Sequence, residues 1–353
     1  GLLIILINSI NLQNSYGVDT IPKTYIIVGE LQELSLYFFM IVLIFYSGEL
    51  IWKEREANLN SIYDATSISD SIGLAAKFLS LLGIYTVMIF SLILFGIAFQ
   101  IANGYYQFEL ELYFYGFFIE VLPYLILYTI VSFFFHIVLN KKFAGFILLI
   151  VFAILNLGSE ALGFEHDLYK FGGNGLASYS EMNGYGHFLK PYLWIKTYWI
   201  LFGILLLIVS APLSVRGAET NLRTRFKLVR YRLSKPLLRA GVMTTIVFLV
   251  IGSYIFYNTN ILNTYKNTFE QGEIYAQYEK TLKKFEYTAQ PKITSTHLKA
   301  ELYPETRNYT IEGHYILKNT QKKVINSIYI QKSLLAQVEL AAINFDKITT
   351  LNN

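Results

Sequence analysis

The stretch VRGAETNLRTRFKLVRYRLSKPLLRA, residues 215–240, decides the fold class of this 353-residue chain. It lies between two long apolar runs, and its only acid is Glu219. Short loops rich in Lys and Arg stay on the cytoplasmic side of a membrane. The segment therefore predicts a membrane protein whose 215–240 loop is cytoplasmic. Its topology-setting cations are Arg216, Arg223, Arg225, Lys227, Arg230, Arg232, Lys235 and Arg239.

A basic cluster can also bind nucleic acid, but that interpretation requires a soluble domain to present the charges. The composition is 54% hydrophobic and 15% charged, and the mean hydropathy is +0.41. This composition is too apolar for an ordinary soluble protein of this length. We therefore expect no nucleic-acid partner, and we expect most of the chain to lie in lipid.

Apolar runs of about the 20 residues needed to cross a hydrocarbon core recur along the chain. Residues 1–10 open inside such a run and predict the end of a further span, so we expect the natural chain to begin before Gly1. The other predicted spans, which make the fold class an α-helical polytopic membrane protein, are 31–52, 73–101, 111–139, 143–163, 190–213 and 241–257.

Alternation across the membrane assigns a side to every connection. Starting from a cytoplasmic 215–240 loop, the turn at Lys141 and Lys142 and the segment from Lys53 onward fall on the same side, and both are basic at the membrane edge. The loops on the other side hold few basic residues, and they are predicted at 11–30, 102–110 and 164–189.

One carboxylate lies well inside a predicted span. Glu120 comes three residues before Pro123, and an ionised acid there costs roughly 2.5–3.5 kcal/mol on insertion scales. Both residues are therefore candidates for an intramembrane function. The alternative is a protonated or paired carboxyl that faces the bundle, helped by a helix kink at Pro123. Other ionisable residues lie nearer span ends and are weaker candidates, namely Glu49, Lys77, His136 and Glu160.

The segment KEREANLNSIYDATSISDS, residues 53–71, follows the first complete span. Its charges alternate at the membrane exit, and Leu59, Ile62 and Tyr63 then recur at helical spacing. This pattern predicts a short amphipathic helix on the membrane surface. Such a helix can receive force from a cytoplasmic partner, or it can simply rest at the interface.

After the last span the hydropathy falls and the periodicity changes. Residues 269–287 carry an apolar stripe at helical spacing, so we expect a solvent-facing helix there. From Thr294 the chain alternates with period two, which predicts an antiparallel β-domain. The predicted strands are HLKAELYPE, YTIEGHYILKN, VINSIYIQKS and VELAAINFDKI. These are few strands for a complete domain, so we expect further sequence after Asn353.

Several kinds of chemistry are missing from the sequence. There is no cysteine, no HExxH pair for zinc and no GxxxxGK[ST] phosphate loop. We therefore expect no catalytic residue, metal or cofactor in this chain, and any ATP would be bound by a partner subunit.

Several phrases of the sequence resemble a known family. They are SGELIWKERE (47–56), NSIYDAT (60–66), SYIFYNTNILNTY (253–265) and YEKTLKKFEYTAQPKI (278–293). Together they resemble the bacterial fusion proteins that combine an ABC transporter permease with an M1 family aminopeptidase. The resemblance covers most of the chain and is a match of phrase and order, without a catalytic signature.

The resemblance implies an ABC-2 type permease region at 1–214, in which the span ending at 1–10 and the five spans to 213 form one six-span bundle. It then implies the basic cytoplasmic loop at 215–240, a tether span at 241–258, a periplasmic helical stalk at 259–292 and the start of an M1-like β-domain at 293–353. It places the protein in a bacterial inner membrane. The zinc motif of the M1 domain would lie beyond Asn353. The loop facing the ATPase would include Lys53, Glu54, Arg55, Glu56, Ile62 and Tyr63.

The leading hypothesis is a permease subunit of an ABC-2 type export system. Its expected partners are an ABC-type ATPase subunit, membrane lipids, and further membrane subunits or a second copy of the chain. The alternative is a membrane-anchored M1-type peptidase or scaffold, although a lone anchor needs one span. A third hypothesis, an ion-coupled carrier using Glu120, would require paired broken helices, and Pro123 has no clear counterpart.

Overall fold

The computed structural model describes residues 21–66, 69–215, 221–306, 308–331 and 340–346. The predicted span at 1–10 and the cation Arg216 lie outside these residues. The chain divides into two compact units, Gly1–Tyr265 and Lys266–Asn353.

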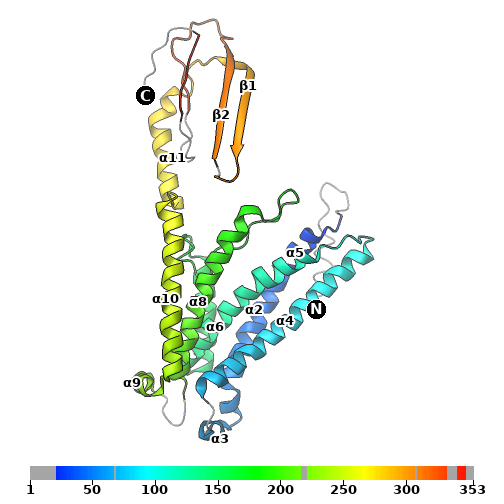
Figure 1. Ribbon diagram of the computed structural model, residues 1–353, viewed down its shortest axis with the longest axis vertical. Coiled ribbons are helices and arrows are strands. Elements are labelled where there is room, and N and C mark those ends of the chain that lie inside the picture. The colour runs from blue at the N-terminus through cyan, green and yellow to red at the C-terminus, as the bar shows by residue number, and fades with distance from the viewer. Residues whose placement is uncertain (1–20, 67–68, 216–220, 307, 332–339, 347–353) are drawn as a thin grey trace. The chain divides into compact units, whose positions relative to one another are not determined.

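The first unit is built from helices joined by turns and one longer loop (Figure 1). In chain order they are α2 (Thr24–Glu56), α3 (Asn60–Ala65), α4 (Asp70–Ala102), α5 (Leu110–Phe114), the π-helical turn η1 (Tyr115–Val121), α6 (Leu122–Leu139), α7 (Lys142–Leu157), the 3-10 turn η2 (Gly186–Phe188), α8 (Leu189–Leu213), α9 (Leu222–Arg232), α10 (Lys235–Phe256) and the π-helical turn η3 (Tyr257–Ile261).

Among the described residues, five helical stretches are long and apolar enough to cross a membrane. They coincide with five of the predicted spans and indicate a multi-pass membrane protein. Their outer faces carry exposed apolar side chains such as Val87, Leu94 and Val250, as a surface in contact with lipid would. The stretches are Thr24–Glu56, Asp70–Ala102, Leu110–Leu139, Gly186–Leu213 and Lys235–Ile261.

The predicted span at 143–163 is not confirmed at full length. Helix α7 has 16 residues and ends at Leu157, which gives it a length of about 24 Å at 1.5 Å per residue. A hydrocarbon core is about 30 Å thick. The chain leaves the helix through Gly158 into turns, and Gly163 adopts a φ of +85°. The apolar composition of this segment was therefore a poor guide to its helical length.

The core of the first unit lies around α6, which packs against α2, α7 and α8. In the most apolar window of its span 61% of the residues are buried, compared with 11% for the span of α10. Tyr128 and Phe133 of α6 and Phe117 of η1 are almost completely buried. Because volume changes in a close-packed interior are destabilising, we expect α6 to tolerate substitution less than the more exposed helices.

Helix boundaries follow local sequence signals. Ser69 accepts a hydrogen bond from the amide of Ile72 before α4, and Ser234 accepts one from Leu237 before α10. Hydroxyls at these positions satisfy amides that have no partner within the helix. At the other kind of boundary, α6 ends where Asn140 adopts a φ of +50°, a left-handed conformation that asparagine tolerates.

The connections gather at two ends of the unit, as predicted. At one end, which we call the basic end, Arg55 after the first span contacts Asn140 and Val215. At the opposite end Gln100 donates to the carbonyl of Pro22 at 2.9 Å, and Lys23 pairs with Glu181 at 2.6 Å. The described contacts thus bring each predicted set of loops together. The side of the membrane that each end faces remains a prediction.

In its described residues the second unit contains an α-helix and a β-hairpin. Helix α11 (Thr268–Leu282) is followed by the 3-10 turn η4 (Lys283–Phe285), and it begins with a capping box formed by Asn267 and Glu270. Strands β1 (Lys292–Tyr303) and β2 (Asn308–Lys318) pair antiparallel. The helix and the first two strands therefore lie where the periodicity predicts them.

The prediction of further strands is wrong for the residues that the structure describes. Residues 324–331 and 340–346 form no strand. The first segment is held by a side chain instead of a ladder, because the amide of Tyr329 donates to Oε1 of Gln290 at 2.9 Å. The ring of Tyr329 also lies 4.3 Å from that of Phe285. Alternating apolar and polar residues make a segment suitable for a strand, but a strand also needs a neighbouring strand to form hydrogen bonds with.

Candidate functional site

The charged end of α2 is tied to two neighbouring helices by ion pairs. Lys142 at the start of α7 binds Glu49 and Glu56 at 2.5 and 2.6 Å. Lys77 of α4 binds Glu54 at 2.7 Å. The alternating charges predicted at the membrane exit thus connect α2 to α4 and α7.

Arg55 extends these connections to two further parts of the bundle. Its Nη1 donates to Oδ1 of Asn140 at 2.6 Å, and its Nη2 donates to the carbonyl of Val215 at 3.2 Å. The guanidinium also lies 5.3 Å from the centroid of the Trp52 ring. A displacement of the α2 terminus would therefore be transmitted to the ends of both α6 and α8.

The predicted coupling segment divides into outward-facing and inward-facing residues. Lys53 is exposed, and Ile62 of α3 is 67% exposed, while Glu54 and Arg55 make the internal contacts described above. Tyr63 falls on α3, and its side chain lies outside what the structure describes. Helix α3 thus offers an exposed apolar side chain at the basic end, and α2 offers the exposed cation Lys53 there.

Arg225, one of the predicted topology-setting cations, is buried and bonded to two spans. It is 1% exposed, and its guanidinium donates to the carbonyls of Ile137 at 2.7 Å, Leu213 at 2.8 Å and Val138 at 2.9 Å. These carbonyls belong to the last turns of α6 and α8, where backbone acceptors have no partner within the helix. Arg225 therefore joins α9 to the ends of two spans, favoured by their negative helix dipoles.

His136, treated as a weak candidate from the sequence, lies in a closed slot between helices. It is 1% exposed, and its Nδ1 accepts a hydrogen bond from Trp52 at 3.3 Å. A Cβ on Gly145 would meet its Nδ1, and a Cβ on Gly48 would lie 3.0 Å from its Nε2. Its Nε2 has no hydrogen-bond partner among the described residues. Two glycines from α2 and α7 thus make room for the imidazole.

Glu120 lies near the opposite end with both carboxylate oxygens occupied. Its Oε2 accepts a hydrogen bond from Gln32 of α2 at 3.0 Å, and its Oε1 accepts one from the amide of Leu176 at 3.2 Å. The Gln32 amide also donates to the carbonyl of Gly116 at 2.9 Å. These contacts favour the interpretation of Glu120 as a paired carboxyl that anchors the 158–185 loop to the bundle.

Pro123 follows a π-helical turn instead of a broken helix. Proline has no amide hydrogen and cannot bond the carbonyl four residues earlier. That carbonyl, on Ile119, accepts a hydrogen bond from the Tyr192 hydroxyl of α8 at 2.8 Å. The proline thus frees an acceptor that fastens two spans together, and turns of this kind are frequent at functional sites.

Two further polar residues near Glu120 were missed from the sequence. Lys196 is 7% exposed, donates to the carbonyl of Gly172 at 2.6 Å and lies 4.9 Å from the centroid of the Tyr192 ring. The side chain of Gln32 carries no charge, so the search for ionisable residues within the spans did not identify it. The signal that could have identified Lys196 is its place inside the predicted span 190–213, where a cation needs a partner.

At the same end His166 holds the end of the last span. Its Nε2 lies 3.1 Å from both Oγ1 of Thr259 and Nδ2 of Asn260. Its ring meets that of Tyr265 edge to face at 4.6 Å. Burial lowers the pKa of His166, and the charge of Asp167 opposes this shift. The neutral imidazole is therefore the form that fits the folded state.

This contact predicts a pH-dependent stability. Below the ordinary histidine pKa of about 6.5 the unfolded chain binds a proton that folded His166 resists, so stability should fall as the pH decreases from 7 towards the lowered pKa. We expect thermal unfolding in detergent to show this decrease. The variant His166→Gln should lose that part of the pH dependence, whereas an unchanged pH profile in the variant would contradict the assignment.

No group of three or more His, Cys, Asp or Glu residues that could hold a metal is present among the described residues. The rings of His297 and His314 stack at 4.8 Å across the hairpin, and the two imidazoles form a cross-strand pair. No metal role is assigned to them.

Comparison with known proteins adds no identification. No family model matches the chain, and no curated protein and no solved structure matches it.

Proposed function

We propose that the chain is a membrane-spanning permease subunit of an ABC-2 type export system in a bacterial inner membrane. In this proposal the basic end faces the cytoplasm and a separate ATPase, and the second unit is periplasmic. The observation that carries the proposal is the α2–α3 corner, where an exposed surface adjoins residues bonded to several other helices.

The contacts of α2 support transmission of force. Glu54, Arg55 and Glu56 bind partners in or beside α4, α6, α7 and α8, so the α2 terminus is a common attachment point. A partner that pushes on α3 would act on that attachment point directly. For the push to drive transport, the partner must bind two bundle arrangements with different affinity.

The orientation is supported by the basic residues. The connections at the basic end carry Lys53, Lys141, Lys142 and the cations of 221–240, which the positive-inside rule assigns to the cytoplasm. The second unit would then lie outside. Its β1–β2 hairpin occupies the position that the family resemblance gives to the start of an M1-like domain.

A charge reversal at Lys53 tests the coupling surface. Because Lys53 is exposed at the basic end, Lys53→Glu should leave folding intact. It should weaken the partner contact about tenfold, which corresponds to about 1.4 kcal/mol, because the reversed charge repels a partner surface that suits a cation. The measurement is ATP hydrolysis by the copurified ATPase, titrated against the purified permease in lipid.

Lys190→Glu is the matched control, because Lys190 is also exposed but lies at the opposite end. It should leave the titration unchanged. Equal behaviour of the two variants would count against coupling through α2 and α3. Repeated copurification from the native membrane that yields no ATPase would favour the alternative, a membrane-anchored M1-type peptidase or scaffold whose spans serve as an anchor.

A further inference from the structure

Helices α8 and α10 leave an apolar groove between them near the basic end. Its volume is about 340 Å³, within the range of roughly 300–1,000 Å³ typical of ligand sites. A Cβ on Gly241 would already be in van der Waals contact with Cγ2 of Ile208 at 3.4 Å, so a longer side chain at this position would fill the groove. We call this the α8–α10 groove, and its walls include Ile208, Leu237, Leu238, Gly241, Val242 and Ile246.

Two exposed cations continue the α10 wall of the groove towards the basic end. Lys235 and Arg239 precede Val242 and Ile246 at helical spacing, so all four share one face of the helix. This face therefore changes along its length from positively charged to apolar. A ligand that follows it needs a negative end and a long hydrocarbon end.

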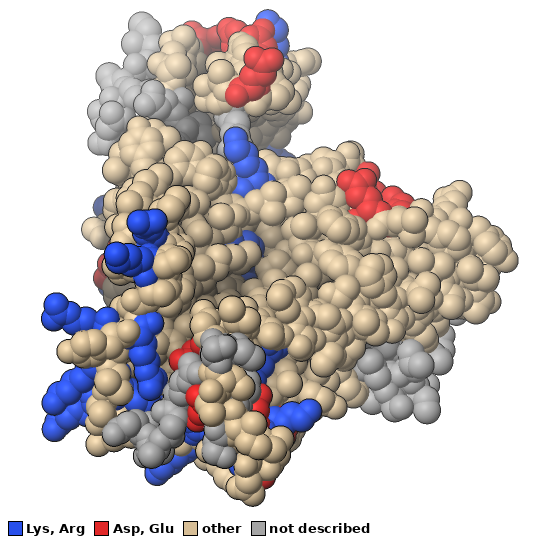
Figure 2. Space-filling model, turned by 60° about the horizontal axis from the view of Figure 1, so that its bottom comes forward, with Lys and Arg blue, Asp and Glu red and all other residues tan. Residues whose placement is uncertain are grey.

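The stretch that carries these two cations has no acid of its own. Residues 221–240 contain no Asp or Glu, and Figure 2 shows blue side chains gathered at this end of the molecule. The exposed cations of this segment are Arg223, Lys227, Arg230, Lys235 and Arg239. None of them forms an ion pair with another described residue.

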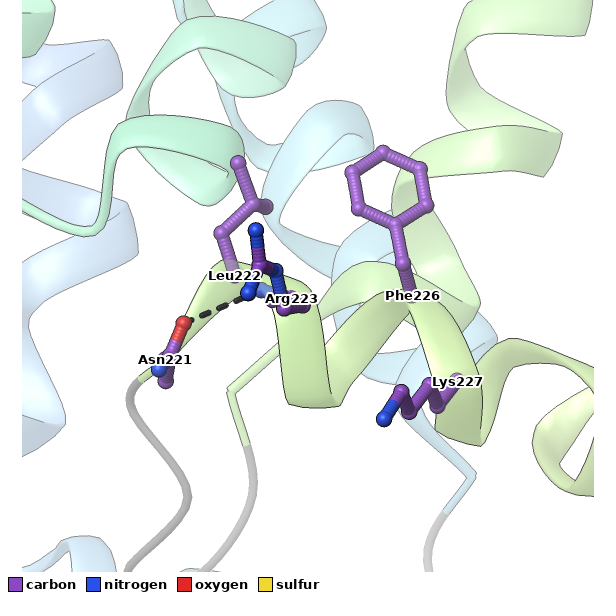
Figure 3. Close-up of a pocket in the computed structure, with 5 residues that line it drawn as sticks. All are labelled: Asn221, Leu222, Arg223, Phe226 and Lys227. Carbon is purple, nitrogen blue, oxygen red and sulfur yellow. Dashed lines mark hydrogen bonds between the residues drawn. The ribbon is translucent and has the colours of Figure 1, made fainter.

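Helix α9 repeats the same combination of apolar and basic side chains. In Figure 3 Leu222 and Phe226 point the same way from the helix while Lys227 points away from them. Together with Asn221 and Arg223 they line an open hollow. Phe226 is 56% exposed, as expected of a helix lying in a membrane interface with its basic residues near the headgroups.

We propose that the α8–α10 groove binds an anionic phospholipid, with one acyl chain along Gly241 and Val242 and the phosphate between Lys235 and Arg239. The apolar groove favours a lipid over a nucleic acid, which would use the cations alone. It also favours a lipid over a free anion, which has no hydrocarbon to bury. The site requires that the first unit lie in a membrane, and it is independent of coupling to an ATPase.

Native mass spectrometry of the full chain in detergent tests the site, with phosphatidylglycerol and phosphatidylcholine as probes. We expect the native chain to retain phosphatidylglycerol preferentially. Replacing both cations (Lys235→Gln with Arg239→Gln) should weaken that binding about tenfold, and Gly241→Leu should weaken it by filling the groove. Thr245→Leu is a second groove-filling variant if Gly241→Leu does not fold.

Matched controls separate the site from general effects. Lys322→Gln with Lys323→Gln removes two exposed cations of the second unit, and Val250→Phe adds bulk to α10 outside the groove. Both should bind phosphatidylglycerol as the native chain does. Equal retention of the two lipids, unchanged binding in the groove variants, or complete competition by glycerol phosphate or an acidic peptide would overturn the proposal.

Discussion

Replacement of Arg225 by Met is expected to destabilise the first unit by about 3 kcal/mol or more. The substitution removes three hydrogen bonds from a charged donor, each worth about 1.5–3 kcal/mol, and leaves buried carbonyl oxygens without a partner. Those oxygens belong to Ile137, Val138 and Leu213, so the loss acts on two spans at once. Thermal unfolding of the purified chain in detergent measures the effect.

Two companion variants define the cause. Arg225→Lys keeps the charge but cannot reach three carbonyls from one planar group, so we expect an intermediate loss. Arg223→Met removes an exposed cation from the same helix and should change stability by less than about 0.5 kcal/mol. If Arg225→Met unfolds at the same temperature as the native chain, the guanidinium does not hold α9 to the span ends.

Replacement of Gly145 by Ala is expected to destabilise the bundle by about 1–3 kcal/mol through overpacking. The added Cβ would collide with the imidazole of His136, which cannot retreat because Gly48 and Trp52 enclose it. The double variant Gly145→Ala with His136→Ala should lose less stability than the sum of the single variants, because the collision is then absent.

Gly83→Ala is the control for this pair. A Cβ at position 83 meets no described atom within 4 Å, so the substitution should stabilise α4 by up to about 1 kcal/mol through its higher helix propensity. Additive losses in the Gly145 and His136 variants would show that the two residues do not contact each other. The same unfolding assay in detergent serves for all four variants.

The sequence predicted those features that depend on local composition. Five spans, the α3 helix, α11 and the first two strands follow from hydrophobic runs and their periodicity. The grouping of loops at two ends followed from alternation across the membrane. None of these inferences required knowledge of which helices are neighbours.

The features that the sequence did not predict depend on contacts between residues far apart in the chain. Arg225 looked like the other cations of its loop, although its spacing from Leu222 and Val229 places it on their helix face. The slot around His136 needs glycines from two other helices, and nothing in the sequence relates Gly48 to Gly145. Likewise, the bonds of Glu120 to Gln32 and Leu176 come from segments far away in the chain.

The central claim is that α3 contacts a separate ATPase. The direct measurement places a photocrosslinking residue at position 62, which is 67% exposed, or at position 106 of the opposite end, which is 68% exposed, in cells of the native host. The account predicts that the probe at position 62 captures a subunit that carries a phosphate loop, and that the crosslinking yield changes when ATP is added. The probe at position 106 should capture no such subunit. Failure to crosslink such a subunit at position 62, or equal crosslinking at both positions, would contradict it.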